Sequence, residues 1–346
     1  MSISNLGLSL LVITMNLCIY SIIGSIIGIR LGNSQIKISA KNAAYCTFFT
    51  TLISSMCLVY AFVTNDFSIK YVFMHSNLSM DPAYTWVAMY AGNEGSLLYI
   101  ALVISLSILL VLLFKPKDMY ESEPHLIAIM SGFLLFFIGV MVFFANPFDT
   151  FQTNIPSDGR GMNPLLAHPG MFSHPPLLMA GLATISIPFS LITSMILTGT
   201  FRNNGLDFVR TTSLIVWSIL GVGLLLGSWW AYTILGWGGY WVWDPIENVG
   251  LMPWLVMTAF IHSIIVQRRR GMFRVWNVLL IFLAFVLAQF GMFINRGGPV
   301  VSVHSFAAST LGYIFLGFMV FSALFCSLIF IACLLYTSPS PRDLYQ

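Results

Sequence analysis

The chain has 346 residues, of which 58% are hydrophobic and only 8% charged, and its formal net charge is +3. Soluble domains carry roughly 25% charged residues, so this composition excludes a soluble protein and predicts one that has the bilayer as its solvent. The weak net charge gives no reason to expect a nucleic-acid partner.

Nine apolar stretches are long enough, or nearly long enough, to cross a bilayer, which takes about 20 residues as a helix. In chain order they are Leu6–Ile29, Ala43–Phe62, Gly95–Phe114, Leu126–Ala145, Leu177–Leu197, Ser213–Trp230, Leu251–Val266, Val275–Ile294 and Leu311–Leu335. The runs are continuous rather than alternating, which favours helices over barrel strands. We predict an all-α, polytopic integral membrane protein with about nine transmembrane helices.

The two ends of the chain lead to different expectations. Leu6–Ile29 lacks a preceding basic segment and a following small-residue cleavage site, so we expect a retained helix rather than a signal peptide. Residues 1–335 are expected to form one transmembrane domain. Residues 336–346, "YTSPSPRDLYQ", cannot continue a helix and are expected to be a disordered or non-native tail, at a point where a longer natural chain is cut short.

The basic residues predict the orientation in the membrane. Eleven of the 15 lie in one set of alternate loops, three lie in the other set, and Arg342 lies in the tail. Because basic loops stay in the cytoplasm, this distribution places the N-terminus outside and the run Arg268–Arg270 inside. The long loops around Thr64–Glu94 and Asn146–His174 and the short loop Asn295–Phe306 then lie outside, on the periplasmic side of a bacterial inner membrane. We therefore expect the protein to act there.

Four of the six histidines are candidate ligands. His262 lies inside a predicted span, nearer its cytoplasmic end, and is either a neutral imidazole bonded to a backbone carbonyl or an axial haem ligand. His174 and His304 begin the fifth and ninth spans on the outer side and can reach one bound group from two directions. His168 competes with His174 for that position. His75 and His125 are expected to be solvated loop residues.

Six of the nine tryptophans fall between positions 229 and 254. An aromatic belt at the membrane interface is the simpler interpretation, but a belt is spread over all helix ends and this cluster is not. Its glycines and Asp-Pro turn predict a shaped aromatic surface that suits a flat aromatic ligand such as porphyrin. The candidate binding residues are Trp229, Trp230, Trp237, Trp241, Trp243, Asp244, Glu247 and Trp254, with Arg296 as a cation for a porphyrin carboxylate.

The segment "GSWWAYTILGWGGYWVWDPIENVGLMPWL" from Gly227 resembles the WWD domain of the haem-handling proteins of cytochrome c maturation. Within that family the chain is most similar to the CcmF-type subunits of the system I cytochrome c haem lyase and their NrfE-like relatives. Four further segments carry the likeness, which extends over about residues 40–330: "NEGSLL", "GMNPLLAHPGMFSHPPLL", "HSIIVQRRRGMFRVWNVLL" and "SVHSFA".

The resemblance implies that the WWD loop (228–255) holds haem b, that His174 and His304 ligate its iron, and that His262 is one of two ligands to a transmembrane b-haem. The family's second transmembrane histidine lies in a later segment, which implies that this second site is incomplete here. The implied partners are the haem chaperone CcmE, a CcmH-type subunit that presents apocytochrome c, and apocytochrome c itself. Quinol is implied as an electron donor, and membrane lipid surrounds the protein.

Three alternatives remain open on the sequence. A haem transporter or exporter without lyase activity also needs an external haem surface. A CcsA-type synthetase of system II shares the WWD domain but differs around it. A bis-histidine b-type cytochrome needs paired histidines within spans, and only His262 qualifies.

Overall fold

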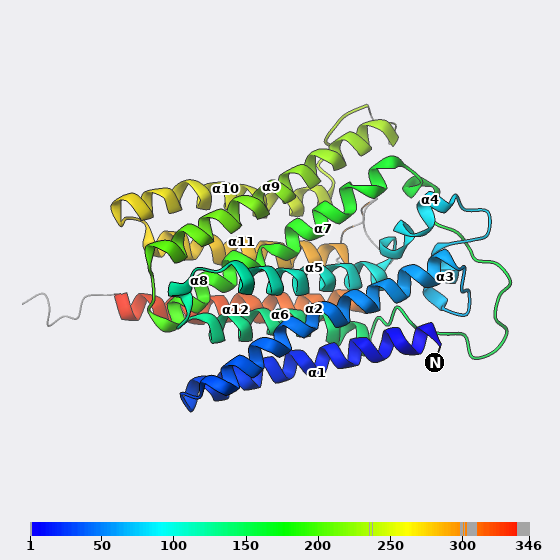
Figure 1. The fold of residues 1–346 in the computed structure, drawn as a ribbon. Helices are drawn as coiled ribbons and strands as arrows, with labels where there is room; N and C mark the ends of the chain where they lie inside the picture. The colour runs from blue at the N-terminus through cyan, green and yellow to red at the C-terminus, as the bar shows by residue number, and fades with distance from the viewer. Residues whose placement is uncertain are drawn as a thin grey trace, which may run out of the picture. The chain divides into compact units, whose positions relative to one another are not determined.

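A computed structural model describes residues 2–234, 236, 238–297, 300, 302 and 310–337 of the chain (Figure 1). Within these residues the regular structure is helical, and two segments pair only through an isolated bridge between Ile69 and Thr150. Nine helical segments of the described chain are long and apolar enough to cross a membrane, as the sequence predicts. The predicted tail falls outside the described residues from Ser338 onward.

The helices are named here as in Figure 1. The α-helices are α1 (Ile3–Arg30), α2 (Ser34–Val63), α3 (Lys70–His75), α4 (Pro82–Thr85), α5 (Asn93–Phe114), α6 (Glu123–Phe143), α7 (His174–Thr184), α8 (Ser186–Thr198), α9 (Asn203–Ile234), α10 (Pro245–Arg270), α11 (Arg274–Asn295) and α12 (Leu311–Thr337). The 3₁₀ turns are η1 (Val87–Tyr90), η2 (Lys117–Met119), η3 (Pro164–Leu166) and η4 (Pro169–Phe172).

The chain divides into two compact units, and each is described by itself. The first unit comprises Met1–Lys115, Glu123–Ser186 and Ser218–Val242, and the second comprises Pro116–Ser122, Ile187–Trp217 and Trp243–Gln346. One boundary falls within α9 and another falls between Val242 and Trp243, inside the tryptophan cluster. The candidate site residues are therefore distributed over both units.

In the first unit, α1 and α2 lie side by side as a long hairpin (Figure 1). The buried face of α1 is rich in small residues, which let the two backbones approach closely where lipid supplies no hydrophobic driving force. A Cβ atom added at Gly24 would lie 3.1 Å from the Cβ of Ala40. The hydroxyl of Ser54 donates to the carbonyl oxygen of Gly7 over 3.0 Å and joins the helices further.

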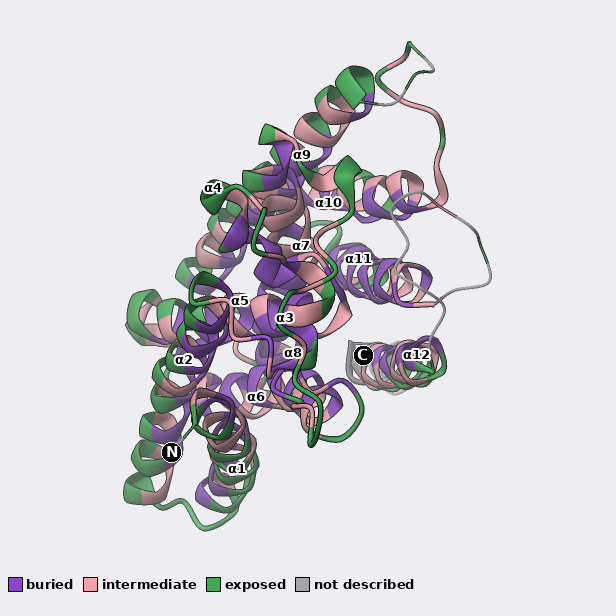
Figure 2. Cartoon of the chain, turned by 90° about the vertical axis from the view of Figure 1, so that its right-hand side faces the viewer, coloured by how far each residue is buried: buried purple, intermediate pink, exposed green. Residues whose placement is uncertain are grey.

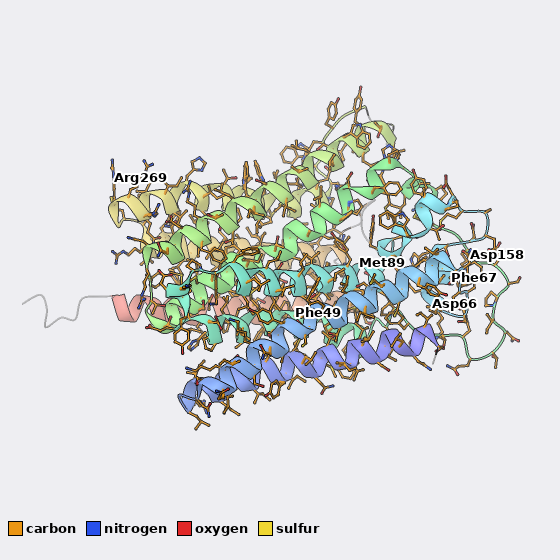
Figure 3. The ribbon with its side chains drawn as sticks, viewed as in Figure 1. Phe49, Asp66, Phe67, Met89, Asp158 and Arg269 are labelled. Atoms are coloured by element: carbon orange, nitrogen blue, oxygen red, sulfur yellow. The ribbon has the colours of Figure 1, made fainter. Side chains whose placement is uncertain are left out.

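Two long loops of the first unit are joined to each other at one end of its helices. The amide of Lys70 donates to Asp149 O over 2.8 Å, and the amide of Arg160 donates to Phe73 O over 2.7 Å. Figure 3 labels Asp66 and Asp158 in these loops. The loops enclose a small core of Val87, Tyr90 and Met171, against which the side chain of Trp230 packs. This core fixes the segment that leads into α7.

The fifth predicted span, Leu177–Leu197, consists of two helices. α7 ends at Thr184 and α8 begins at Ser186. Pro188 has no amide hydrogen to donate to the carbonyl of Thr184, so the helical hydrogen-bond ladder is interrupted at this point. The hydroxyl of Thr184 donates back to Ala180 O over 2.7 Å. The kink lies at the boundary between the two units.

In the second unit, α11 packs against α10 on one side and α12 on the other. Figure 2 shows α11 largely buried, in purple, whereas α12 carries many exposed residues. The rings of Phe189 and Phe285 stack at 3.9 Å between centroids. At one end, Arg268 forms an ion pair of 2.6 Å with Asp207, which ties α10 to the start of α9.

α9 is longer than a membrane crossing requires. Its 32 residues extend about 48 Å at 1.5 Å per residue, against a hydrocarbon core of about 30 Å. The helix therefore continues past the membrane and carries Trp229 and Trp230 as helical residues. The predicted WWD loop is accordingly shorter: residues 228–234 belong to α9 and residues 245–255 to α10.

Candidate functional site

His174 is the first residue of α7, as the sequence predicts, and its imidazole is buried with 7% of the residue exposed. Its Nδ1 lies 2.8 Å from the carbonyl oxygen of Gly223 on α9. A carbonyl oxygen only accepts, so Nδ1 carries the proton and donates. In the neutral ring the lone pair then lies on Nε2, the arrangement that orients a histidine toward a metal ion.

Glycines at the α7–α9 contact make room for this imidazole. A Cβ atom at Gly227 would lie 2.5 Å from His174 Cε1, and one at Gly223 would lie 2.8 Å from the backbone nitrogen of Leu178. Neither distance is compatible with a side chain unless the helices move apart. The two glycines thus determine both the spacing of α7 and α9 and the place of the ring.

Trp230 lies between two imidazoles of the first unit. Its ring meets His174 edge to face, with centroids 5.7 Å apart and planes at 88°. It stacks on His168 at 5.7 Å with planes at 19°. Trp229, one residue earlier on α9, also contacts His168, with centroids 5.1 Å apart. The first unit thus brings Trp229, Trp230, His168 and His174 together.

His168 holds the opposite tautomer from His174. Its Nδ1 accepts the amide hydrogen of Gly170 over 3.0 Å, so the proton lies on Nε2 in the neutral ring. That nitrogen lies 3.2 Å from Thr233 Oγ1, and the threonine hydroxyl can donate in turn to Trp230 O over 3.0 Å. Burial lowers the pKa of His168 below its ordinary value and keeps the ring neutral. Both ring nitrogens of His168 therefore have partners within the protein.

An aromatic pair beside the tryptophans is missing from the sequence-based site. Tyr232 and Tyr240 stack at 4.4 Å with planes at 10°, although they lie on either side of the tight glycine-containing turn. Both residues are exposed, as is Trp229. The sequence contained a signal for this pair: Tyr232 and Tyr240 flank the glycine-rich segment "LGWGG", and glycines favour a turn that brings flanking residues together. The two tyrosines add an exposed, stacked aromatic pair to the first unit.

Asp244 organises the part of the tryptophan cluster that belongs to the second unit. Its Oδ1 accepts the amide of Ile246 over 2.9 Å and so caps the N-terminus of α10. The same oxygen accepts from the hydroxyl of Ser302 over 2.7 Å. Ser302 lies two residues before His304, so Asp244 anchors the chain close to the predicted second iron ligand. His304 and Trp237 themselves lie outside the described residues.

Trp243 adopts a left-handed backbone conformation, with φ of +62°, and its side chain is 71% exposed. A bulky residue rarely adopts this conformation, and such strain persists only where the surroundings enforce it. Here the side-chain amide Nδ2 of Asn248 donates to Trp243 O over 2.9 Å. Glu247, in the first turn of α10, complements the positive end of the helix dipole.

Replacing Asp244 with Ala is expected to destabilise the protein by about 1 kcal/mol through loss of the helix cap alone. Asp244→Asn keeps an acceptor oxygen and should retain most of the cap. Ser302→Ala keeps the cap and removes only the bond to residue 302. Thermal unfolding of the three variants in one detergent measures the difference. An Ala variant as stable as the Asn variant would show that the cap contributes nothing.

A second polar and aromatic group joins α9 to α10 and includes the carbonyl partner of His262. The indole rings of Trp217 and Trp254 stack with their centroids 5.1 Å apart. The indole N–H of Trp217 donates to Thr258 Oγ1 over 2.7 Å, and that of Trp254 donates to Trp217 O over 3.2 Å. One turn further along α10, Nδ1 of His262 donates to Thr258 O over 2.8 Å. Trp254 thus packs α10 on α9, while His262 is exposed on α10 with its lone pair on Nε2.

The structure places the remaining histidines and Arg296 as follows. His75, expected in solvent, is partly buried beside Tyr71, whose carbonyl oxygen lies 2.9 Å from its Nδ1. His125 lies in the first turn of α6 rather than in a loop. Arg296, expected to face a ligand from an outer loop, is the C-cap residue of α11 and only 1% exposed. Its predicted contact with a porphyrin carboxylate stays a prediction.

The fold and these sites define a class: an all-α membrane protein with nine candidate spans in its described residues and, in its first unit, an aromatic, histidine-bearing region where α7 begins and α9 ends. Residues 90–301 match the model of a family described as "Cytochrome C assembly protein". The match covers more than half of the chain and includes His174, His262 and the tryptophan cluster. The chain belongs to the cytochrome C assembly protein family.

Relatives with known names support this membership. The chain is 37% identical over 320 residues to cytochrome c-type biogenesis protein CcmF of Escherichia coli, covering 91% of this chain and 49% of that protein. It is 33% identical over 290 residues to NrfE of Haemophilus influenzae, covering 84% and 46%. A solved structure, "Cytochrome c Heme Lyase CcmF", superposes with a TM-score of 0.80 at 29% identity, over 99% of this chain and 53% of that one. The chain thus spans about half the length of these relatives.

Proposed function

We propose that the chain is the haem-handling part of a cytochrome c haem lyase. It binds haem b at the Trp-rich WWD surface and promotes its covalent attachment to the thiols of apocytochrome c. Membership of the cytochrome C assembly family and the names of the relatives support a role in cytochrome c maturation. The observation that carries the haem assignment is the placement of His174: Gly223 O holds its Nδ1–H, and its ring meets Trp230 beside the exposed aromatic side chains of α9.

In this proposal each residue has a physical role toward the haem that is being attached. His174, with His304 from the other loop, supplies an axial nitrogen to the iron. Trp229, Trp230, Trp237, Trp241 and Trp243 position the flat macrocycle by stacking. Arg296 and the acidic residues Asp244 and Glu247 shape the polar edge of the surface. The reactivity belongs to the haem, and the protein contributes orientation and protection.

The covalent step balances without an oxidant. Each cysteine thiol of a C-x-x-C-H motif adds across one haem vinyl group: a carbon–sulfur bond forms, the S–H bond breaks, and the hydrogen goes to the other vinyl carbon. A histidine of the apocytochrome then takes over one axial position at the iron. Holding the macrocycle in one orientation converts a collision between two proteins into a reaction between preplaced groups.

His262 would hold the iron of a transmembrane b-haem. Its Nδ1–H is held by Thr258 O, and the residue is exposed on α10. Such a haem, once bound, would supply electrons that keep the delivered haem reduced, with quinol as the proposed donor. Within the described residues no second histidine lies mid-span, so this chain would provide one ligand of the two.

The proposed location is the bacterial inner membrane, with the WWD surface on the periplasmic side, because the basic loops favour the cytoplasm. The proposed partners are the haem chaperone CcmE, a CcmH-type subunit and apocytochrome c.

Purification of the chain from haem-replete cells, together with a tagged apocytochrome that carries C-x-x-C-H, tests the proposal. We expect a haem absorption band and capture of the apocytochrome. A colourless protein would contradict the haem assignment. A coloured protein that never captures apocytochrome would instead support a transporter without lyase activity.

A further inference from the structure

The turn between α10 and α11 gathers four arginines and three large apolar side chains at one end of the second unit. We call residues 268–276 the basic turn. Its arginines are Arg268, Arg269, Arg270 and Arg274, and its apolar residues Met272, Phe273 and Trp276 are 50%, 49% and 51% exposed. Basic residues next to exposed aromatic ones indicate a ligand that is both anionic and apolar.

Two of the four arginines are available for such a ligand. Arg268 forms the ion pair with Asp207, and Nε of Arg274 donates to Gly271 O over 3.2 Å. Arg269 and Arg270 are exposed and make no hydrogen bond or ion pair with any other described residue. Figure 3 labels Arg269 at the end of α10. The basic turn therefore carries uncompensated positive charge.

The backbone holds the apolar side chains in place. Gly271 and Phe273 both adopt left-handed conformations, with φ of +69° and +64°. Glycine accepts this readily, whereas a phenylalanine does so only where its surroundings impose it. A buried hydrogen bond closes the base of this turn: the side-chain amide Nδ2 of Asn277 donates to Gln267 Oε1 over 2.6 Å.

The lengths of the helices place the basic turn at the level of lipid headgroups. α10 has 26 residues and α11 has 22, or about 39 Å and about 33 Å, against a hydrocarbon core of about 30 Å. Tryptophan is favoured at this interface, and arginine reaches from it into water. A guanidinium group also matches a phosphodiester with two parallel N–H donors.

We propose that the basic turn binds the headgroup of an anionic phospholipid. Arg269 and Arg270 hold the phosphodiester, and Phe273 and Trp276 pack against the glycerol and the first acyl carbons. None of its residues is among those proposed to hold haem, and the test measures lipid rather than haem, so its result is independent of the proposed function. Anionic lipid then anchors the α10–α11 hairpin at this surface of the membrane.

Native mass spectrometry of the purified full chain in mild detergent measures the bound lipid during titration with phosphatidylglycerol. We expect saturable binding that phosphatidylcholine with the same acyl chains does not reproduce. The double variant Arg269→Gln/Arg270→Gln should bind phosphatidylglycerol at least about tenfold more weakly. Each basic residue near an anionic membrane surface raises the affinity on the order of several-fold, and the variant removes two.

The matched control is Arg30→Gln/Arg202→Gln, which removes two exposed charges from other loops predicted on the same side of the membrane. It should bind the lipid as the unmodified chain does. Equal binding of the two lipids, unchanged binding by the Arg269/Arg270 variant, or an equal loss in the control would each overturn the proposal. Displacement of the lipid by inorganic phosphate at equal concentration would do so too. Thermal unfolding without added lipid confirms that both double variants fold.

Discussion

Replacing His174 with Gly is expected to lower the haem retained at the WWD surface by roughly tenfold to a hundredfold or more, because loss of even an outer partner of a metal ligand costs this much. The imidazole meets the ring of Trp230 and donates to the Gly223 carbonyl oxygen, and the variant removes both contacts. Free imidazole added to the variant should restore part of the haem content. Absorption spectra of the purified proteins at equal concentration measure the effect.

His168→Asn is the control for this experiment. His168 also contacts Trp229 and Trp230, but its Nδ1 is used by Gly170 and its Nε2 by Thr233. We expect it to keep most of the haem and to respond little to added imidazole. If His168→Asn loses haem and is rescued while His174→Gly is not affected, the ligand assignment is reversed. Equal, unrescued losses would mean that the two histidines act through folding alone.

Replacing Gly223 with Ala is expected to destabilise the protein by roughly 1–3 kcal/mol, the usual cost of overpacking a core. The added Cβ atom would lie 2.8 Å from Leu178 N and 3.0 Å from Leu177 C, which are backbone atoms that cannot rotate away. Separation of α7 from α9 would also lengthen the hydrogen bond between His174 and Gly223. Thermal unfolding and haem content should therefore fall together.

Gly139→Ala is the matched control for this substitution. Gly139 lies in the transmembrane helix α6 of the same unit, and a Cβ atom there meets nothing within 4 Å. Because alanine is the better helix former by about 1 kcal/mol, the variant should be as stable as the unmodified chain or more so. A Gly223→Ala variant that matches it in stability would show that the α7–α9 spacing is not limiting.

The two expected effects share one cause, which is the contact between α7 and α9. His174 meets Gly223 across 49 residues of sequence, and Gly181 on α7 is equally close to α9, with a Cβ atom 2.6 Å from Leu220 Cα. The hydrogen bond that fixes the histidine tautomer therefore depends on helix packing. Substitutions that never touch a ligand can change the candidate site through this contact.

Local properties of the sequence were sufficient for much of the fold. Hydropathy over some 20 residues predicted the nine spans, because each membrane helix satisfies its backbone hydrogen bonds internally. The start of α7 at His174 also followed from local signals, whereas α10 begins at Pro245, ahead of the predicted span from Leu251. The sequence did not predict the break at Ile185, although Pro188 lies just after it. The apolar residues Leu177–Leu197 are continuous and were predicted as one span.

The site depended on contacts that no local pattern contains. The sequence by itself determined the membrane class and the helices. Only the tertiary structure decided that His174 and His168 hold opposite tautomers, that Trp254 locks against Trp217, that Tyr232 stacks on Tyr240, and that Arg296 is buried. The reason is physical. A membrane helix forms through hydrogen bonds within its own segment. The tautomer of an imidazole and the burial of a guanidinium depend instead on the groups that a distant helix brings beside them.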